Sequence, residues 1–236
     1  MKSATNLFKW KHFNVEIILL TVRWYLQYRL SYRDLVEMMS ERGISISHTT
    51  IMRWVHQFAP EIAKIVRSHL KQVNDSWRCD ETYIKVKGKW TYLYRAVDSK
   101  GKTIDFRLSE KRDMKAAQRF FEKALSSNHA QIPRVITVDK NPAYPVAIEN
   151  LKNNNKLPHE TQIRQTKYLN NIIEQDHRFI KKRTNPMLGF KSFLTAEQTI
   201  QGIEAMHMIK KGQVEYNHSS PLFVVQLIHQ LFGLIA

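Results

Sequence analysis

Cysteine is nearly absent from this chain: Cys79 is the single cysteine among 236 residues. One thiol cannot close a disulfide within the chain, and it cannot supply a cysteine-rich zinc site. Cysteine used this sparingly is typical of proteins that remain in a reducing cytosol. We therefore expect a cytoplasmic protein, and a metal site, if there is one, must use other ligands.

Long apolar runs are also missing. The final sixteen residues, 221–236, form the most apolar stretch, and three polar side chains interrupt it: Gln226, His229 and Gln230. This stretch is shorter than the roughly 20 apolar residues that a membrane helix needs. The N-terminus has no signal-peptide pattern, because charged residues bracket its first apolar run. We expect no membrane span, and we interpret the tail as a packing helix or a subunit contact.

Acidic residues are scarce relative to basic ones. Lys and Arg number 37 against 21 Asp and Glu, which gives a net charge of +16 and a pI near 9.9. Such a balance favours a polyanionic partner, either nucleic acid or an anionic membrane surface. Without a membrane segment, nucleic acid is the stronger interpretation. The alternative interpretation is that the positive charge only keeps the protein soluble.

The first seventy residues have helical periodicity. Residues 14–28 and 31–43 carry apolar side chains at helical spacing, and a third helix follows a short turn that contains Gly43. Two helices joined in this way are typical of a helix-turn-helix, although a plain three-helix bundle fits the pattern too. Pro60 predicts a kink or an end of the third helix. Polar side chains near its start suit base edges and phosphates in a major groove: Ser47, His48, Thr49, Thr50 and Arg53.

From Ser76 onward the period changes to two residues. Three strands are expected up to residue 108, joined by glycine-containing turns at 87–89 and 98–102. Helices and short strands then alternate: a helix at 112–127, a strand at 134–139, a helix at 142–153, a strand at 161–166 and a helix at 167–183. This order predicts a mixed α/β domain with a five-stranded sheet and flanking helices.

Three acids stand out by their positions in these elements. Asp80 falls on the first strand, Asp139 ends the fourth, and Glu174 lies early in the last helix. Acids are rare in apolar strands unless they are paired or bind metal, although each one alone could be a satisfied structural acid. Three carboxylates without a Cys or His cluster suit Mg²⁺ or Mn²⁺. Two such ions can activate an attacking oxygen and stabilise the leaving oxygen of a phosphodiester.

The helix around Glu174 is strongly basic. Asn171, Glu174, Arg178 and Lys181 step by three or four residues and so share one face. We expect Asn171, Arg178, Lys181 and the adjacent Lys182 to contact DNA around the acid. A solvated helix with an ordinary Glu174–Arg178 ion pair is the alternative.

Three segments carry a family resemblance: "DETYIKVKGKWTYLYRAVDSKGKTIDF", "VDKNPAY" and "KYLNNIIEQDHRFIKKR". They resemble the signature stretches of bacterial insertion-sequence transposases of the insertion-sequence-six family, and the likeness runs from about Phe8 to His207. It implies a helix-turn-helix that reads terminal inverted repeats, then a ribonuclease-H-like core like that of retroviral integrases. The implied Asp-Asp-Glu triad is Asp80, Asp139 and Glu174.

Two further acids lie in the same motifs. Strand alternation points Glu81 away from Asp80, so we leave Glu81 outside the triad. Asp176 lies about 200° around the helix from Glu174, which predicts a structural or surface role. Lys181 matches the family's basic residue beyond the glutamate.

The resemblance implies a transposase that cuts double-stranded DNA at element ends and joins it to target DNA with divalent cations. Because two ends must be held together, we expect a homodimer or a higher homo-oligomer, associated with the bacterial nucleoid. A same-fold nuclease without strand transfer and a catalytically dead DNA-binding regulator are the rival functions. The expected domains are a helix-turn-helix domain at 1–70, a catalytic domain at 76–186 and a helical extension at 187–236 that packs on the catalytic domain or a partner subunit.

Overall fold

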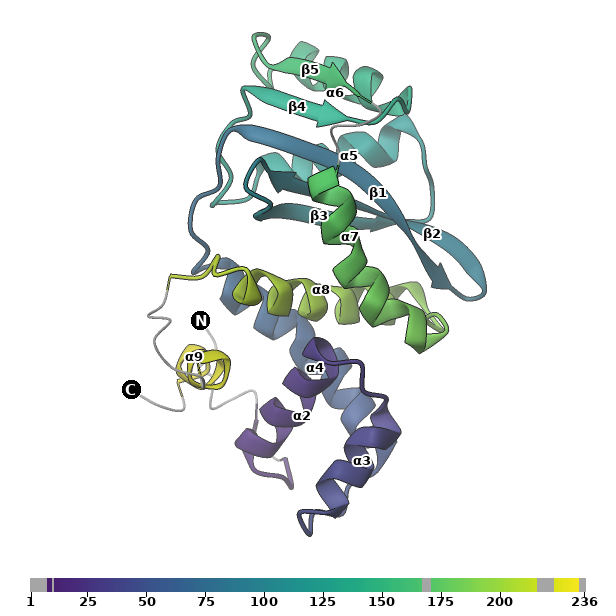
Figure 1. Cartoon of the computed structure of the whole chain (residues 1–236), viewed down its shortest axis with the longest axis vertical. Helices are drawn as coiled ribbons and strands as arrows, with labels where there is room; N and C mark the ends of the chain where they lie inside the picture. Colours follow the sequence, from purple (N-terminus) through teal and green to yellow (C-terminus); the bar gives the residue numbers. More distant parts are fainter. Residues whose placement is uncertain (1–7, 10, 167–170, 216–222, 234–236) are drawn as a thin grey trace. The chain divides into compact units, whose positions relative to one another are not determined.

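The computed structural model describes residues 8–9, 11–166, 171–215 and 223–233 (Figure 1). Its contacts divide the chain into two compact units: Met1–Leu70 with Leu194–Ala236, and Lys71–Phe193. The C-terminal residues are thus grouped with the N-terminal helices, a division that differs from the three segments expected from the sequence. Within the described residues, no helix combines the length and the apolarity needed to cross a bilayer.

The first unit is helical. It comprises α2 (Val15–Gln27), α3 (Tyr32–Ser40), α4 (His48–Arg67), α8 (Phe193–Lys210) and α9 (Phe223–Leu231). Gly202 of α8 has no space for a side chain, because an added Cβ would lie 2.6 Å from atoms of Ala59 and Leu26. Helix α8 therefore packs closely against α4 and α2, as only a glycine allows.

The connection between α3 and α4 has the expected glycine-containing turn, and a side chain caps the start of each helix. Ser31 and Asp34 form a reciprocal capping box at the start of α3. Gly43 adopts a left-handed φ of 72° in the turn, a conformation that costs glycine little. Ser47 caps α4 by accepting a hydrogen bond from the backbone N–H of Thr50. The helix–turn–helix order predicted for this segment is therefore present.

Pro60 had predicted either a kink or an end of α4. The helix does not end there but continues to Arg67. Apolar side chains on both sides of the proline are buried, among them Phe58, Ile62 and Val66. Because most helix stability in proteins comes from packing an apolar face, this burial offsets the lost backbone hydrogen bond.

The second unit contains the sheet. Its strands are β1 (Ser76–Val86), β2 (Lys89–Asp98), β3 (Thr103–Ser109), β4 (Val135–Val138) and β5 (Gln162–Gln165). They lie in the order β3-β2-β1-β4-β5, antiparallel from β3 to β1 and parallel from β1 to β5. The expected mixed sheet of five strands is confirmed. Lys87 and Gly88, both with positive φ, form the tight turn of the β1–β2 hairpin.

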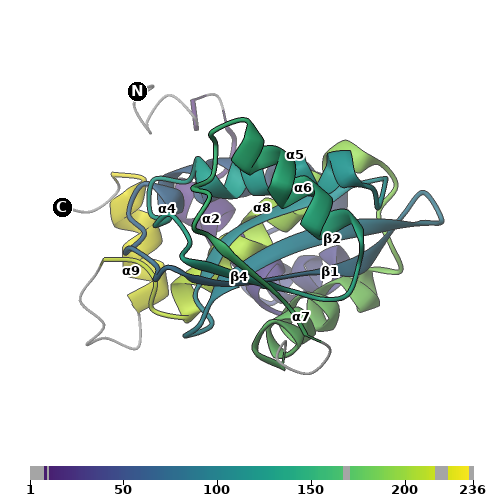
Figure 2. The same ribbon diagram turned by 90° about the horizontal axis from the view of Figure 1, so that it is seen from above.

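Helices cover both faces of this sheet (Figure 2). Helices α5 (Met114–Leu125) and α6 (Ala143–Asn153) enclose the main core on one face, which includes Trp77, Tyr94 and Tyr144. Helix α7 (Asn171–Thr184) lies on the other face and continues into the short helix η1 (Asn185–Met187). The first four residues of the predicted helix, 167–170, lie outside the described residues. Each of the two faces thus carries a different part of the candidate site.

Candidate active site at the edge of β1 and β4

Two of the three predicted acids are brought together by strand register. Strands β1 and β4 are parallel neighbours, and Arg78 pairs with Thr137. Two residues further along each strand, this register places Asp80 beside Asp139. Because β4 ends at Val138, the Asp139 carboxylate stands at the carboxyl end of its strand. Both side chains are partly buried, so they remain accessible to a ligand.

A third carboxylate lies within this group. Oxygen atoms of Asp80, Glu81 and Asp139 all lie within 4.8 Å of one another. Sequence reasoning had left Glu81 aside, because strand alternation points it away from Asp80. Its side chain does share a face with Trp77 and Cys79, but its long carboxylate still ends near Asp80. Strand alternation fixes the direction of the Cα–Cβ bond, but the end of a long side chain such as that of glutamate can still approach a neighbouring residue.

Glu81 is buried in a set of hydrogen bonds. The hydroxyl of Tyr144 and the Nε–H of Arg112 both donate to its carboxylate. The Asn141 amide also donates to this carboxylate, at 3.4 Å. The side chain of Glu81 is only 2% exposed. Arg112 also approaches Asp139, with 3.6 Å between Nη2 and Oδ2. Glu81 therefore orders Arg112 and Tyr144 around the pair of aspartates.

Glu174 occupies the exposed face of α7, in its first turn. It does not belong to the group of acids within 4.8 Å. Its charge nevertheless contributes to the raised pKa of Asp80, so it lies within electrostatic range. The structure thus joins Asp80 and Asp139 directly and presents Glu174 from the helix that covers β1.

The electrostatics of the site disfavour a charged Asp80. Burial, together with the negative charges of Glu81, Asp139 and Glu174, raises the pKa of Asp80 to about 7, although a hydrogen bond from the Glu81 N–H opposes the shift. The carboxylates repel one another, and a bound cation would relieve that repulsion. This property and the all-oxygen donor set fit Mg²⁺ or Mn²⁺.

Helix α7 is attached to the sheet behind Asp80. Asp176 forms a buried ion pair of 2.7 Å with Arg95, which pairs with Asp80 across the β1–β2 ladder. His177 is also buried, and its Nδ1 lies 3.8 Å from Asp80. Burial and the nearby Arg95 lower the pKa of His177 to about 3, so the ring is neutral and this approach is not an ion pair. Asp176 accordingly has the structural position expected for it.

The candidate DNA contacts lie on two accessible surfaces, one in each unit. On α4, Ser47, His48 and Arg53 are exposed, whereas Thr49 and Thr50 are half-buried. The Ser47 hydroxyl lies 2.9 and 2.8 Å from the hydroxyls of Thr49 and Thr50, so the three order one another. On α7 all four predicted contacts are exposed: Asn171, Arg178, Lys181 and Lys182.

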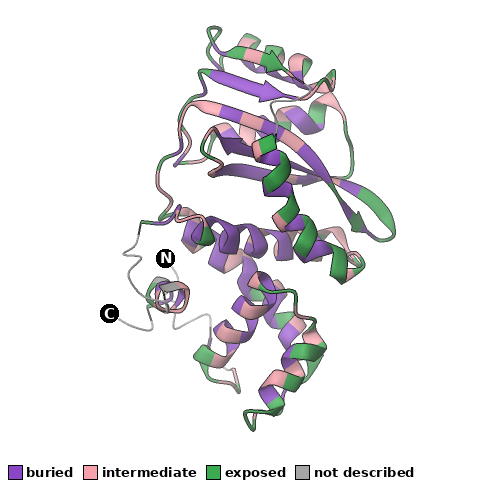
Figure 3. Cartoon of the chain, viewed as in Figure 1, coloured by how far each residue is buried: buried purple, intermediate pink, exposed green. Residues whose placement is uncertain are grey.

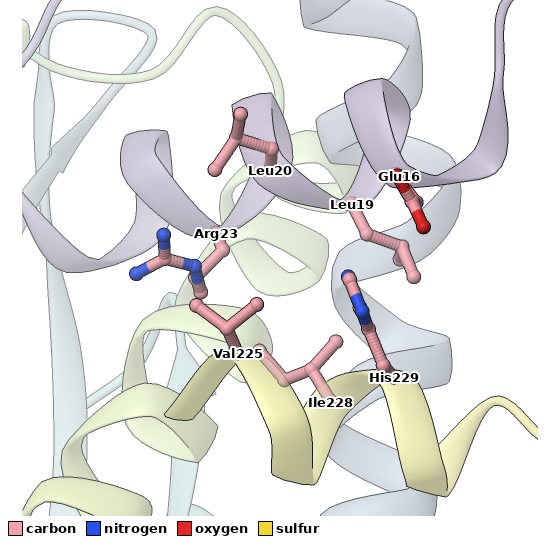
Figure 4. A pocket seen from close by; sticks show the side chains of 7 residues that line it. All are labelled: Glu16, Leu19, Leu20, Arg23, Val225, Ile228 and His229. Atoms are coloured by element: carbon pink, nitrogen blue, oxygen red, sulfur yellow. The ribbon is translucent and has the colours of Figure 1, made fainter. Parts of the chain in front are cut away.

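A cavity in the helical unit is unrelated to these acids. It measures about 210 Å³ and lies between α2 and α9, as Figure 4 shows. Leu19, Leu20, Val225 and Ile228 give it an apolar lining, which Glu16, Arg23 and His229 complete. None of the carboxylates near Asp80 lines it, so we place no chemistry there.

Comparison with known proteins identifies the class. A family model described as a DDE domain matches residues 74–213. The transposase for insertion sequence-like element IS431mec from Staphylococcus aureus is 42% identical over 206 residues, covering 87% of this chain and 89% of that protein. The transposase of insertion sequence IS257 in transposon Tn4003, also from Staphylococcus aureus, matches to the same extent. The chain therefore belongs to the DDE transposases of the insertion-sequence-six family.

Solved structures of retroviral integrases resemble the chain more distantly. The HTLV-2 integrase catalytic core domain in complex with magnesium has a TM-score of 0.44 and 17% identity, covering 63% of this chain and 91% of that one. The BIV integrase catalytic core domain has a TM-score of 0.44 and 16% identity, covering 66% and 97%. The family assignment depends on the sequence matches alone.

Proposed function

We propose that this transposase binds the terminal inverted repeats of an insertion sequence and performs both DNA cleavage and strand transfer with divalent cations. The observation that carries the proposal is the juxtaposition of Asp80 and Asp139 by the β1–β4 register. Glu174, on the helix that packs behind them, completes the proposed catalytic set. Phosphodiester chemistry requires neutralisation of charge on the transferred group, and clustered carboxylates can hold the cations that supply it.

Asp80, Asp139 and Glu174 would hold Mg²⁺ or Mn²⁺, and two ions are the expected number. When bound, these cations polarise the attacking oxygen and offset charge on the leaving oxygen. The residues of the chain provide the rest. Glu81 and Arg112 fix Asp139 from one face of the sheet, while the ion pair of Asp176 with Arg95 fixes α7 on the other.

Two exposed surfaces would position the DNA. The cap and first two turns of α4 expose Ser47, His48 and Arg53, side chains that suit the major groove of an inverted repeat. Arg178, Lys181 and Lys182 on α7 would bind phosphates close to Glu174. The net charge of +16 supports attraction of the protein to DNA.

Joining requires that two element ends be held at once, so we propose at least a homodimer that acts on the bacterial nucleoid. Incubation of the purified protein with an oligonucleotide duplex that carries an element end tests the function. In Mg²⁺ we expect cleavage at the 3′ end and joined products, and in EDTA neither. Cleavage without joining from pre-cut ends would favour a nuclease, and binding without cleavage would favour a regulator.

A further inference from the structure

Large aromatic side chains are exposed on the β1–β2 hairpin. Tyr83 is 45% exposed and Trp90 is 65% exposed, although aromatic rings usually contribute to cores. Their ring centroids lie 6.4 Å apart, and Tyr92, which is half-buried, lies 5.4 Å from Tyr83. The outer end of this hairpin is largely exposed in Figure 3. We refer to Tyr83, Trp90 and Tyr92 as the aromatic patch.

The three rings share one face of the hairpin. Tyr83 pairs directly with Tyr92, and the next pair on that face joins Lys85 to Trp90. Glu81, two residues before Tyr83, faces the same way by alternation. Tyr83 lies near enough to Arg112 to contribute to the raised pKa of that arginine, which contacts Glu81 and Asp139. The patch therefore lies next to Glu81 and Arg112, on the opposite face of β1 from the side chain of Asp80.

The charge around the patch favours an anionic partner. Residues 83–92 include Lys85, Lys87 and Lys89 but no acid, and all three lysines are exposed. A second copy of the chain would bring the same cations to the interface, and like charges would oppose that contact. Exposed rings interspersed with lysines are the arrangement with which proteins bind single-stranded nucleic acid.

We propose that the aromatic patch binds unpaired DNA bases beside the scissile phosphate. This inference rests on the proposed function, and it states which part of the DNA the aromatic patch binds. The bases of an intact duplex stack on one another, so their faces are available to protein rings only where pairing is broken. At about 3.3 Å per strand residue, Tyr83 lies roughly 10 Å along β1 from Asp80, and alternation directs its ring to the face that carries Glu81 rather than Asp80. Bases stacked on it would belong to unpaired nucleotides a short distance from the cleaved bond, on the side of Glu81 and Arg112.

The test compares two DNA duplexes of the same sequence, one blunt and one with a single-stranded overhang that contains 2-aminopurine. Binding to the full-length protein is measured in EDTA by anisotropy, and stacking by quenching of 2-aminopurine fluorescence. The variants are Trp90→Ala, Tyr83→Ala and the ring-preserving Trp90→Phe. Ile132→Ala is the control, because Ile132 has a similar exposure of 66% in the same unit.

We expect the wild-type protein to prefer the overhang. Trp90→Ala and Tyr83→Ala should each weaken overhang binding roughly tenfold and reduce quenching, while binding of the blunt duplex stays the same. Trp90→Phe should retain most of the preference, and Ile132→Ala all of it. Equal affinities for the two duplexes in every variant would overturn the inference. So would a loss of oligomerisation in Trp90→Ala without any change in DNA binding, because that result assigns the patch to a subunit contact. The assay needs no cleavage, so its outcome is independent of whether the protein cuts DNA.

Discussion

Asp176 of α7 and Arg95 of β2 form an ion pair of 2.7 Å in which the arginine side chain is fully buried and the aspartate is 7% exposed. Arg95 lies directly across the β1–β2 ladder from Asp80. Two residues before Asp176, Glu174 projects from the exposed face of the same helix. The buried pair thus connects β2, the strand that pairs with the strand of Asp80, to the helix that carries Glu174.

Breaking this pair should destabilise the protein strongly. Asp176→Asn removes the carboxylate that faces a buried guanidinium, a change that typically costs about 3–5 kcal/mol. Gln175→Ala, at the exposed neighbouring position, should change the free energy of unfolding by less than about 0.5 kcal/mol. Denaturant unfolding of both variants measures the difference. A cost below about 1 kcal/mol for Asp176→Asn would show that the pair does not hold α7 in place.

The raised pKa of Asp80, about 7, predicts a pH dependence of stability in the metal-free protein. The folded state binds this proton more tightly than the unfolded state does, so the free energy of unfolding should increase as pH falls from about 7 towards 4. This contribution to the free energy of unfolding is lost as pH rises through about 7. Asp80→Asn removes this contribution. Urea unfolding in EDTA at several pH values gives the wild-type-minus-variant difference, and parallel curves for the two proteins would contradict the assignment.

Divalent cations should stabilise the folded protein if the carboxylates bind them. At a concentration one hundred times the dissociation constant, a ligand that binds only the folded state adds about 2.7 kcal/mol. We expect Mg²⁺ to raise the melting temperature of the wild-type protein at pH 7.5 in a thermal-shift experiment. Asp139→Asn should lose most of that gain, whereas Asp75→Asn, an aspartate outside the acid group, should keep it. An equal gain in both variants would place the cation elsewhere.

Recognition of the inverted repeat should depend on the first turns of α4. Arg53→Ala removes an exposed cation there and should weaken binding of an element end by about 1–3 kcal/mol. Lys64→Ala is the matched control, because Lys64 is exposed on the same helix about three turns further along. Anisotropy with specific and scrambled duplexes measures both variants. If Lys64→Ala reduces specific binding as much as Arg53→Ala does, the helix-turn-helix does not read the repeat through this turn.

Much of the fold followed from local patterns in the sequence. The turn at Lys87 and Gly88, the glycine turn before α4 and the short buried strand next to Asp139 each depend on neighbouring residues, and each is present where the sequence predicted it. Pro60 does not end α4, because burial of this helix depends on the rest of the unit, which no local pattern contains.

Contacts distant in the chain were harder to foresee. Glu81 receives hydrogen bonds from Arg112 and Tyr144, 31 and 63 residues away, and strand alternation alone gives no sign of them. Arg95 did offer a signal: an arginine inside the apolar segment of β2 must have a buried partner. Its partner, Asp176, could not be identified without the packing of α7 on the sheet.

The most direct test is strand transfer from pre-cut element ends in Mg²⁺ by the wild-type protein and by Asp80→Asn, Asp139→Asn and Glu174→Gln, with DNA binding measured in parallel. We predict joined products from the wild-type protein, none from the three variants, and similar binding of the element end by all four proteins. Joined products from the Asp80→Asn or Asp139→Asn variant at the wild-type rate would contradict the proposal that these carboxylates carry the reaction.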